Sequence, residues 1–214
     1  MIRTLLACIL LTLLSAGAAT AAPADPAQPR QRSFRIERVS AHTYAAMAMP
    51  TALVSGNVGI ILCEDHLILI DSTDAPTSAT RLLEQIREEV SELPVRYVIN
   101  THYHADHCWG NCFFPGAVVI GHAKCRQYLV EDGTESLENA QKQNPNLRQV
   151  KIVPPHITFE TGEMTLRVGK KNLILSTTPG HSDDGISVLV EEDRVLFAGD
   201  AFMPLPFIVD GDAD

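Results

Sequence analysis

The feature that most constrains this chain is a six-residue segment, residues 102–107, that reads His-Tyr-His-Ala-Asp-His. It directly follows residues 95–100, an apolar run that is typical of a buried strand. Zinc and similar divalent cations bind imidazole nitrogens and carboxylate oxygens, and a catalytic metal site keeps one position open for water. The segment therefore predicts a metal site on a loop at the carboxyl end of a strand, where α/β folds usually carry their chemistry.

Residues 1–22 have the pattern of a secretory signal peptide. Arg3 gives the charged start, residues 5–14 form an apolar run, and small residues offer an Ala-x-Ala cleavage site near Ala21. The run is too short to span a bilayer comfortably, and no later segment approaches the roughly 20 apolar residues of a membrane helix. We therefore expect an exported protein, periplasmic or secreted, without stable membrane insertion after cleavage. An uncleaved N-terminal anchor is the minor alternative.

The rest of the chain is long enough for one domain. Residues 23–33, rich in proline and alanine, predict a flexible segment, and residues 34–214 can bury a good core. The formal net charge of −9 leaves no basic patch for a phosphate backbone, so nucleic acid is not an expected partner. We expect a small-molecule substrate as the partner, and the sequence does not indicate an oligomeric state.

Four cysteines remain after the predicted signal peptide: Cys63, Cys108, Cys112 and Cys125. In an exported protein they can form disulfides, and four cysteines allow three pairings that the sequence does not distinguish. Buried free thiols are the equal alternative. Metal ligation by cysteine is the minor one, because Cys108 does not complete a Cys-x-x-Cys zinc pattern.

The apolar pattern predicts a βαβ first part followed by a run of strands. Helical spacing over residues 76–93 predicts an amphipathic helix, and shorter helices are expected at 109–114, 123–130 and 136–143. Strands are expected at 34–38, 57–63, 66–71, 95–100, 117–121, 157–159, 164–168, 173–178, 185–190 and 195–198. This order predicts an α/β fold in which two sheets pack face to face with helices outside, a four-layer αββα sandwich.

Two later residues follow the ends of predicted strands, as the histidine-rich segment does. His181 follows a predicted strand in a Pro-Gly-His turn, and Asp200 follows the last predicted strand in Gly-Asp. A lone histidine after a strand is more often structural than a metal ligand. The joint pattern of His-x-His-x-Asp-His, Gly-His and Gly-Asp, however, favours metal ligation. Over residues 35–200 this pattern resembles the metallo-β-lactamase superfamily of metallohydrolases.

The resemblance implies a binuclear metal site, with two zinc ions expected and iron as the other metal that suits the ligands. By the resemblance, His102, His104 and His181 form one site, Asp106 and His107 contribute to a second, and Asp200 bridges the two ions. In such a site, hydroxide held between the ions attacks a carbonyl that the metals polarise, and Asp106 is also expected to be catalytic.

Asp71, at the end of a predicted strand, resembles the family's acid that orients a ligand or the motif loop. A plain turn acid or helix cap is the equal alternative. Tyr103, between two expected ligands, is interpreted as a spacer.

The chain departs from the family's pattern in two places. No histidine follows His181, although the family supplies a further histidine to the second site, and the sequence stops at Asp214, where the family's fold usually continues. We therefore expect a C-terminally incomplete domain. Aspartate at the bridging position resembles the glyoxalase II and lactonase branches, which implies hydrolysis of an ester, thioester or lactone. The alternatives are a β-lactam hydrolase, an iron-dependent oxidoreductase similar to persulfide dioxygenases, and an inactive metal-binding product.

Overall fold

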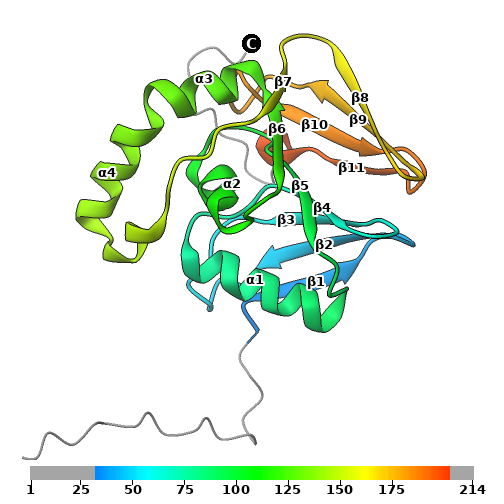
Figure 1. The fold of residues 1–214 in the computed structure, drawn as a ribbon, viewed down its shortest axis with the longest axis horizontal. Helices are drawn as coiled ribbons and strands as arrows, with labels where there is room; N and C mark the ends of the chain where they lie inside the picture. Colours follow the sequence, from blue (N-terminus) through cyan, green and yellow to red (C-terminus); the bar gives the residue numbers. More distant parts are fainter. Residues whose placement is uncertain (1–31, 203–214) are drawn as a thin grey trace, which may run out of the picture. The chain divides into compact units, whose positions relative to one another are not determined.

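The computed structural model describes residues 32–202, so the predicted signal peptide and nearly all of the predicted flexible segment lie outside the described residues. The strands of the described part form two sheets, and helices lie beside them (Figure 1). None of the helices within residues 32–202 is long and apolar enough to cross a membrane.

The larger sheet has seven strands in chain order, antiparallel from β1 to β4 and parallel from β4 to β7. Its strands are β1 (Phe34–Arg38), β2 (Thr43–Ala48), β3 (Val58–Leu62), β4 (Leu67–Ile70), β5 (Val95–Ile99), β6 (Val118–His122) and β7 (Ile157–Phe159). Because β4 and β5 run parallel, their carboxyl ends meet at the same edge of the sheet. The histidine-rich segment begins at that edge.

The smaller sheet is antiparallel and has the strand order β11-β10-β9-β8. Its strands are β8 (Glu163–Val168), β9 (Lys171–Thr177), β10 (Ile186–Val190) and β11 (Val195–Phe197). His181 lies on the connection from β9 to β10, and Asp200 lies just after β11. Each of the two residues therefore follows a strand of this sheet, as the sequence predicts.

The described helices are mostly short. They are α1 (Pro76–Glu89), α2 (Ala105–Cys108), α3 (Ala123–Glu131) and α4 (Gly133–Gln143), with 3₁₀ segments η1 (Trp109–Phe113), η2 (Pro145–Gln149) and η3 (Gly199–Ala201). Helix α1 begins with a proline at its first position, where the missing N–H costs nothing. It ends four residues before the predicted Leu93, because the chain must turn there to enter β5.

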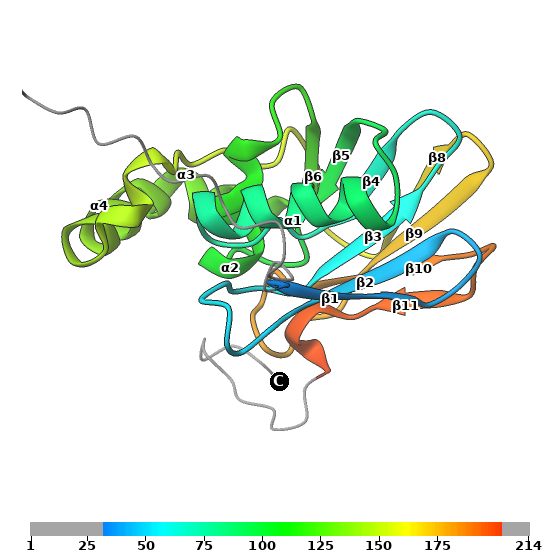
Figure 2. The ribbon, with the colours of Figure 1, turned by 90° about the horizontal axis from the view of Figure 1, so that it is seen from below.

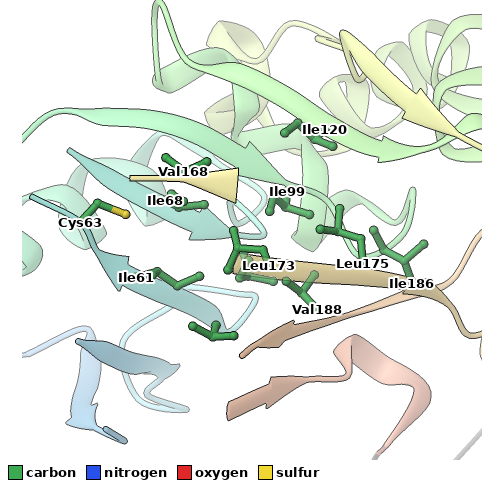
Figure 3. Close-up of a cluster of buried hydrophobic side chains, with 12 residues drawn as sticks. Ile61, Cys63, Ile68, Ile99, Ile120, Val168, Leu173, Leu175, Ile186 and Val188 are labelled. Atoms are coloured by element: carbon green, nitrogen blue, oxygen red, sulfur yellow. The ribbon is translucent and has the colours of Figure 1, made fainter. Parts of the chain in front are cut away.

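The main core lies between the two sheets (Figure 3). Ile68 and Ile99 of the seven-stranded sheet pack in one cluster with Leu173, Leu175 and Val188 of the four-stranded sheet, and all five are fully or almost fully buried. Alternate residues of β9 and β10 point into this cluster, which is the period of two that a half-buried strand shows. Burial of these branched side chains provides the main force that holds the sheets together.

A second apolar cluster covers the other face of the seven-stranded sheet. Leu82 and Ile86 of α1 pack there with Phe34, Ile60 and Leu69 of the sheet. Figure 2 shows α1 on one side of the seven-stranded sheet and the four-stranded sheet on the other. The predicted packing of two sheets face to face, with helices outside, is therefore confirmed; within residues 32–202 the helical cover lies on the side of the seven-stranded sheet.

Strand β2 (Thr43–Ala48) is missing from the sequence prediction. Its sequence, Thr-Tyr-Ala-Ala-Met-Ala, has few β-branched residues and no regular alternation, so it carries a weak strand signal. Pairing with β1 and β3 on both sides imposes the strand. The other predicted strands are present, with ends that differ by one or two residues, and the helix predicted at 136–143 begins earlier, at Gly133.

Replacing Leu173 by alanine removes a fully buried side chain from the core between the sheets. We expect Leu173→Ala to lower the free energy of unfolding by about 2–5 kcal/mol, because it removes buried apolar surface and leaves a cavity. The matched control is Leu53→Ala, since Leu53 is 95% exposed, and its effect should stay within about 0.5 kcal/mol. Urea denaturation followed by circular dichroism measures both; equal effects would contradict the assigned core.

Candidate metal centre

The expected metal ligands come from three separate segments that the fold brings together. Residues 102–107 follow β5, His181 follows β9, and Asp200 lies in η3 after β11. The first segment belongs to the seven-stranded sheet and the other two belong to the four-stranded sheet. The candidate site is therefore built where the ends of the two sheets meet.

Three histidines form the first group of side chains. The Nε2 atom of His102 lies 2.9 Å from Nδ1 of His104, and Nε2 of His181 lies 3.1 Å from the same Nδ1. His102 and His181 are buried, and His104 is partly buried. Ring nitrogens from two distant segments, residues 102–104 and His181, thus converge on one point, as the resemblance implies for the first metal site.

A second group lies beside the first. The Nε2 atom of His107 is 3.6 Å from Oδ2 of Asp106 and 3.5 Å from Oδ2 of Asp200. The same Oδ2 atom of Asp200 lies 3.7 Å from Nε2 of His181, so this carboxylate faces both groups. Asp106 is the most exposed member, with 41% of its side chain accessible, and it belongs to neither of the two described groups whose possible ligand atoms all lie within 4.8 Å of one another.

One buried carboxylate orients the second group. Asp71 has its Oδ2 atom 2.8 Å from Nδ1 of His107 and accepts a bond from the hydroxyl of Thr101 at 2.8 Å. Its Oδ1 atom accepts a bond from the backbone N–H of Thr101 at 2.7 Å. With Nδ1 of His107 turned toward Asp71, Nε2 of the ring points to Asp106 and Asp200. Of the two interpretations of Asp71, the structure favours the orienting acid.

Hydrogen bonds from buried residues also hold the backbone of the motif. The carbonyl oxygen of His107 accepts hydrogen bonds from Nδ2 of Asn100 at 2.9 Å, from the N–H of Ser72 at 2.9 Å and from the hydroxyl of Ser72 at 3.1 Å. All three residues are buried. The metal motif does not reveal these partners in the sequence, although the polar pair Asn100-Thr101 between an apolar strand and the first histidine is a signal for them.

A glycine sets the position of Asp200. Gly199 has a φ angle of +52°, and a Cβ atom there would lie 2.7 Å from Oγ1 of Thr101. Residues other than glycine rarely adopt this backbone conformation, and here their Cβ atom would also collide with Thr101, which binds Asp71. The Gly-Asp pair in the sequence thus reflects a backbone requirement at the point where the last strand reaches the site.

The electrostatics of the site favour a neutral imidazole at His102 and a positive charge at His107. Burial, together with the charges of His107 and His104, lowers the pKa of His102 to about 2. Burial alone would lower the pKa of His107, but the nearby carboxylates of Asp71, Asp200 and Asp106 raise it well above its usual value. A cation bound between these carboxylates can supply the same positive charge as a proton on Nε2.

The donor set therefore fits divalent metal ions. The first group offers three imidazole nitrogens, and the second offers one imidazole and the carboxylates of Asp106 and Asp200. Zinc binds this combination, and so does iron, because both accept imidazole and carboxylate ligands.

The four cysteines of the described part are free thiols, so the disulfide alternative does not hold in this structure. Cys108 is buried, and its thiol donates to the backbone carbonyls of Tyr103 (2.9 Å) and His104 (3.1 Å). Burial raises the pKa of the Cys108 thiol well above its usual value. None of the clusters of possible ligands within residues 32–202 includes a cysteine.

Two cavities open next to the site. A cleft of about 570 Å³ is lined by Asp106, His107 and Asp200, and by apolar residues that include Met47 and Phe197. A second cavity, of about 480 Å³, is lined by His104 and by residues of α3 and α4. Neither cavity is visible in the sequence pattern.

The sequence profile of the metallo-beta-lactamase superfamily matches residues 51–213 of the chain. This chain belongs to the metallo-beta-lactamase superfamily. Solved structures of metallo-beta-lactamases share its fold. The enzyme from Pontibacter korlensis has a TM-score of 0.64 and 19% identity, with 85% of this chain and 79% of that chain covered. IND-7 metallo-beta-lactamase has a TM-score of 0.60 and 19% identity, with 80% and 72% covered.

Curated relatives of this superfamily member are named for different activities. Coenzyme F420H(2) oxidase of Methanothermobacter marburgensis is 23% identical over 66% of this chain and 33% of its own length. Thioesterase pkgB of Emericella nidulans is 30% identical over 62% of this chain and 32% of its length, and lactamase-like protein aptB of the same organism is 27% identical over 72% and 42%. The chain thus spans about a third to two fifths of these relatives.

If Asp71 orients His107, its loss should weaken metal binding in this superfamily member. We expect Asp71→Asn to lower the zinc affinity by about 10- to 100-fold, because the amide no longer provides a charged acceptor for Nδ1 of His107. Competition with a chromogenic chelator measures this affinity. Asp65→Asn is the matched control, since Asp65 is exposed and follows β3, and it should bind zinc as the wild type does. Equal affinities in both variants would exclude the orienting role.

Proposed function

We propose that this chain is a metal-dependent hydrolase that binds two zinc ions and cleaves an ester, thioester, lactone or related carbonyl compound. The observation that carries the proposal is the shared carboxylate, because one oxygen of Asp200 lies between the three-histidine group and the group of His107 and Asp106. Superfamily membership and the name of one relative, a thioesterase, support hydrolysis. From the signal-like residues 1–22, we also propose that the mature protein is exported.

In this proposal the chain's residues have separate tasks. His102, His104 and His181 would hold one ion, Asp106 and His107 a second, and Asp200 would contact both. The bound metals would supply Lewis acidity and a water nucleophile at neutral pH. Asp71 holds the ring of His107 in place, and Asn100 and Ser72 hold its backbone, so the ligand atoms are positioned before substrate arrives.

The lining of the cavities favours an uncharged substrate. Within residues 32–202, neither the cleft beside Asp200 nor the cavity beside His104 is lined by any lysine or arginine. The cleft is lined instead by small and apolar side chains, including Val54, Leu196 and Phe202. A β-lactam of the penicillin type carries a carboxylate, which would find no cationic side chain there. We therefore place ester, thioester and lactone substrates ahead of β-lactams.

The hydrolase proposal predicts that the variant His104→Ala loses turnover of activated esters and lactones by more than about 100-fold, since it removes one of three converging nitrogens. The control is His42→Ala, because His42 has 55% of its side chain exposed and lies outside both ligand groups. Initial rates on p-nitrophenyl esters and on a lactone, measured with added zinc, test both variants. Unchanged rates in His104→Ala would refute the proposal.

An iron-dependent oxidoreductase is the second candidate, because one relative is named as an oxidase and the ligands suit iron. Elemental analysis of the protein purified without added metal or chelator separates the two candidates. We expect about two zinc ions per chain, since the two ligand groups are adjacent and share Asp200. Iron, together with oxygen consumption on a thiol substrate, would favour the oxidoreductase instead.

A further inference from the structure

The cavity beside His104 is separate from the cleft beside Asp200, because the two have no lining residue in common. Its volume of about 480 Å³ lies within the range of small-molecule sites. His104 belongs to the three-histidine group and also lines this cavity. His104 therefore borders both the proposed metal site and this cavity.

Aromatic side chains form the walls of this cavity. Tyr103, Trp109 and Tyr128 line it, and the ring centroids of Tyr103 and Tyr128 are 4.8 Å apart at an angle of 53°. Tyr103 and His104 also have adjacent rings, with centroids 4.6 Å apart. Leu129 adds a buried apolar surface. Such walls are suited to a flat apolar group, which gains from edge and face contacts with the rings.

The aromatic wall is fixed to the loop that carries His181. The hydroxyl of Tyr128 donates to Oδ1 of Asp183 at 2.8 Å, and Lys124 forms an ion pair with the other oxygen of Asp183. Asp183 lies two residues after His181, and its side chain is 10% exposed. The position of Tyr128 is thus linked to the metal site through a short and partly buried network.

The charge at the cavity indicates which groups it accepts. Among the described residues that line it, the exposed Asp132 carries a formal charge, and neither lysine nor arginine is present. Lys124, on the same helix as Tyr128, is paired with Asp183. An anionic group would face Asp132 without a compensating cation, whereas a neutral or cationic aromatic group would not be repelled.

We propose that this cavity is a substrate pocket that binds an aromatic group, uncharged or positively charged, attached to the compound whose carbonyl is cleaved. That the bound compound is a substrate rests on the proposed hydrolase function. The binding pocket itself is tested independently of catalysis.

Trp109 is the only tryptophan of the chain and lines the pocket, so its emission reports on binding there. We expect N-benzylacetamide, a neutral aromatic amide, to change the emission of the zinc-loaded full chain in a saturable way. N-butylacetamide should have no such effect at the same concentrations. No saturable change with the aromatic amide, or an equal change with the butyl amide, would overturn the proposal.

A variant that fills the pocket gives the second arm of the test. Ser136 lines the pocket from α4 and is exposed, so Ser136→Leu should fold normally and raise the dissociation constant of N-benzylacetamide at least about 5-fold by occupying space. Thr134→Leu is the matched control, because Thr134 is also exposed on α4 but does not line the pocket. Melting temperature and zinc content should be unchanged in both. Equal affinities in the two variants would overturn the proposal.

Charge preference and turnover complete the experiment. Asp132→Asn should weaken the binding of benzylammonium and leave that of N-benzylacetamide unchanged; equal affinities for benzylammonium in the variant and the wild type would refute the charge preference. Saturable binding without ester hydrolysis would support the pocket and refute the hydrolase. Hydrolysis with the same KM for benzyl and butyl esters, and no effect of Ser136→Leu on either, would support the hydrolase and refute the pocket.

Discussion

The buried carboxylate of Asp71 connects the fold to the candidate site. It directly follows β4, accepts hydrogen bonds from the backbone and the hydroxyl of Thr101 just after the parallel neighbour β5, and holds the ring of His107. A buried charge is costly unless its partners are fixed, so the ends of β4 and β5 and the start of α2 must keep their relative positions for the carboxylate to remain satisfied. Asp71 adopts a φ angle of +66°, which this arrangement imposes.

The same logic explains why much of the site could be predicted from the sequence. His102, His181 and Asp200 each follow an apolar strand, and strand ends are where a two-sheet fold can bring distant segments together. The spacing of the expected ligands within residues 102–107 is local, so it can be recognised directly in the sequence. The relation between His181 and Asp200 is not local, and it came from the resemblance to a family; the structure brings Oδ2 of Asp200 to 3.7 Å from Nε2 of His181.

Other features could not be predicted because no local pattern encodes them. Strand β2 (Thr43–Ala48) is rich in alanine and is imposed by its neighbours. The sequence suggests a spacer role for Tyr103, yet this residue lines a cavity together with Tyr128. Tyr128 lies 25 positions later in the sequence and reaches Tyr103 because α3 packs beside the motif. Contacts between segments at such separations depend on tertiary packing, which periodicity does not report.

The distribution of charge links the two parts of the proposed activity. Asp71, Asp106 and Asp200 surround His107, so their negative charge favours the binding of cations at the site. The described lining of both adjacent cavities, in contrast, has no lysine or arginine. Within residues 32–202, an anionic group on a substrate would then find its positive partners in the proposed metal ions, at the position that the scissile carbonyl needs. A substrate whose flanking groups are neutral or cationic avoids this competition. The carboxylates of the proposed metal site and the adjacent cavities, whose described lining has no cationic side chain, thus favour the same class of compound.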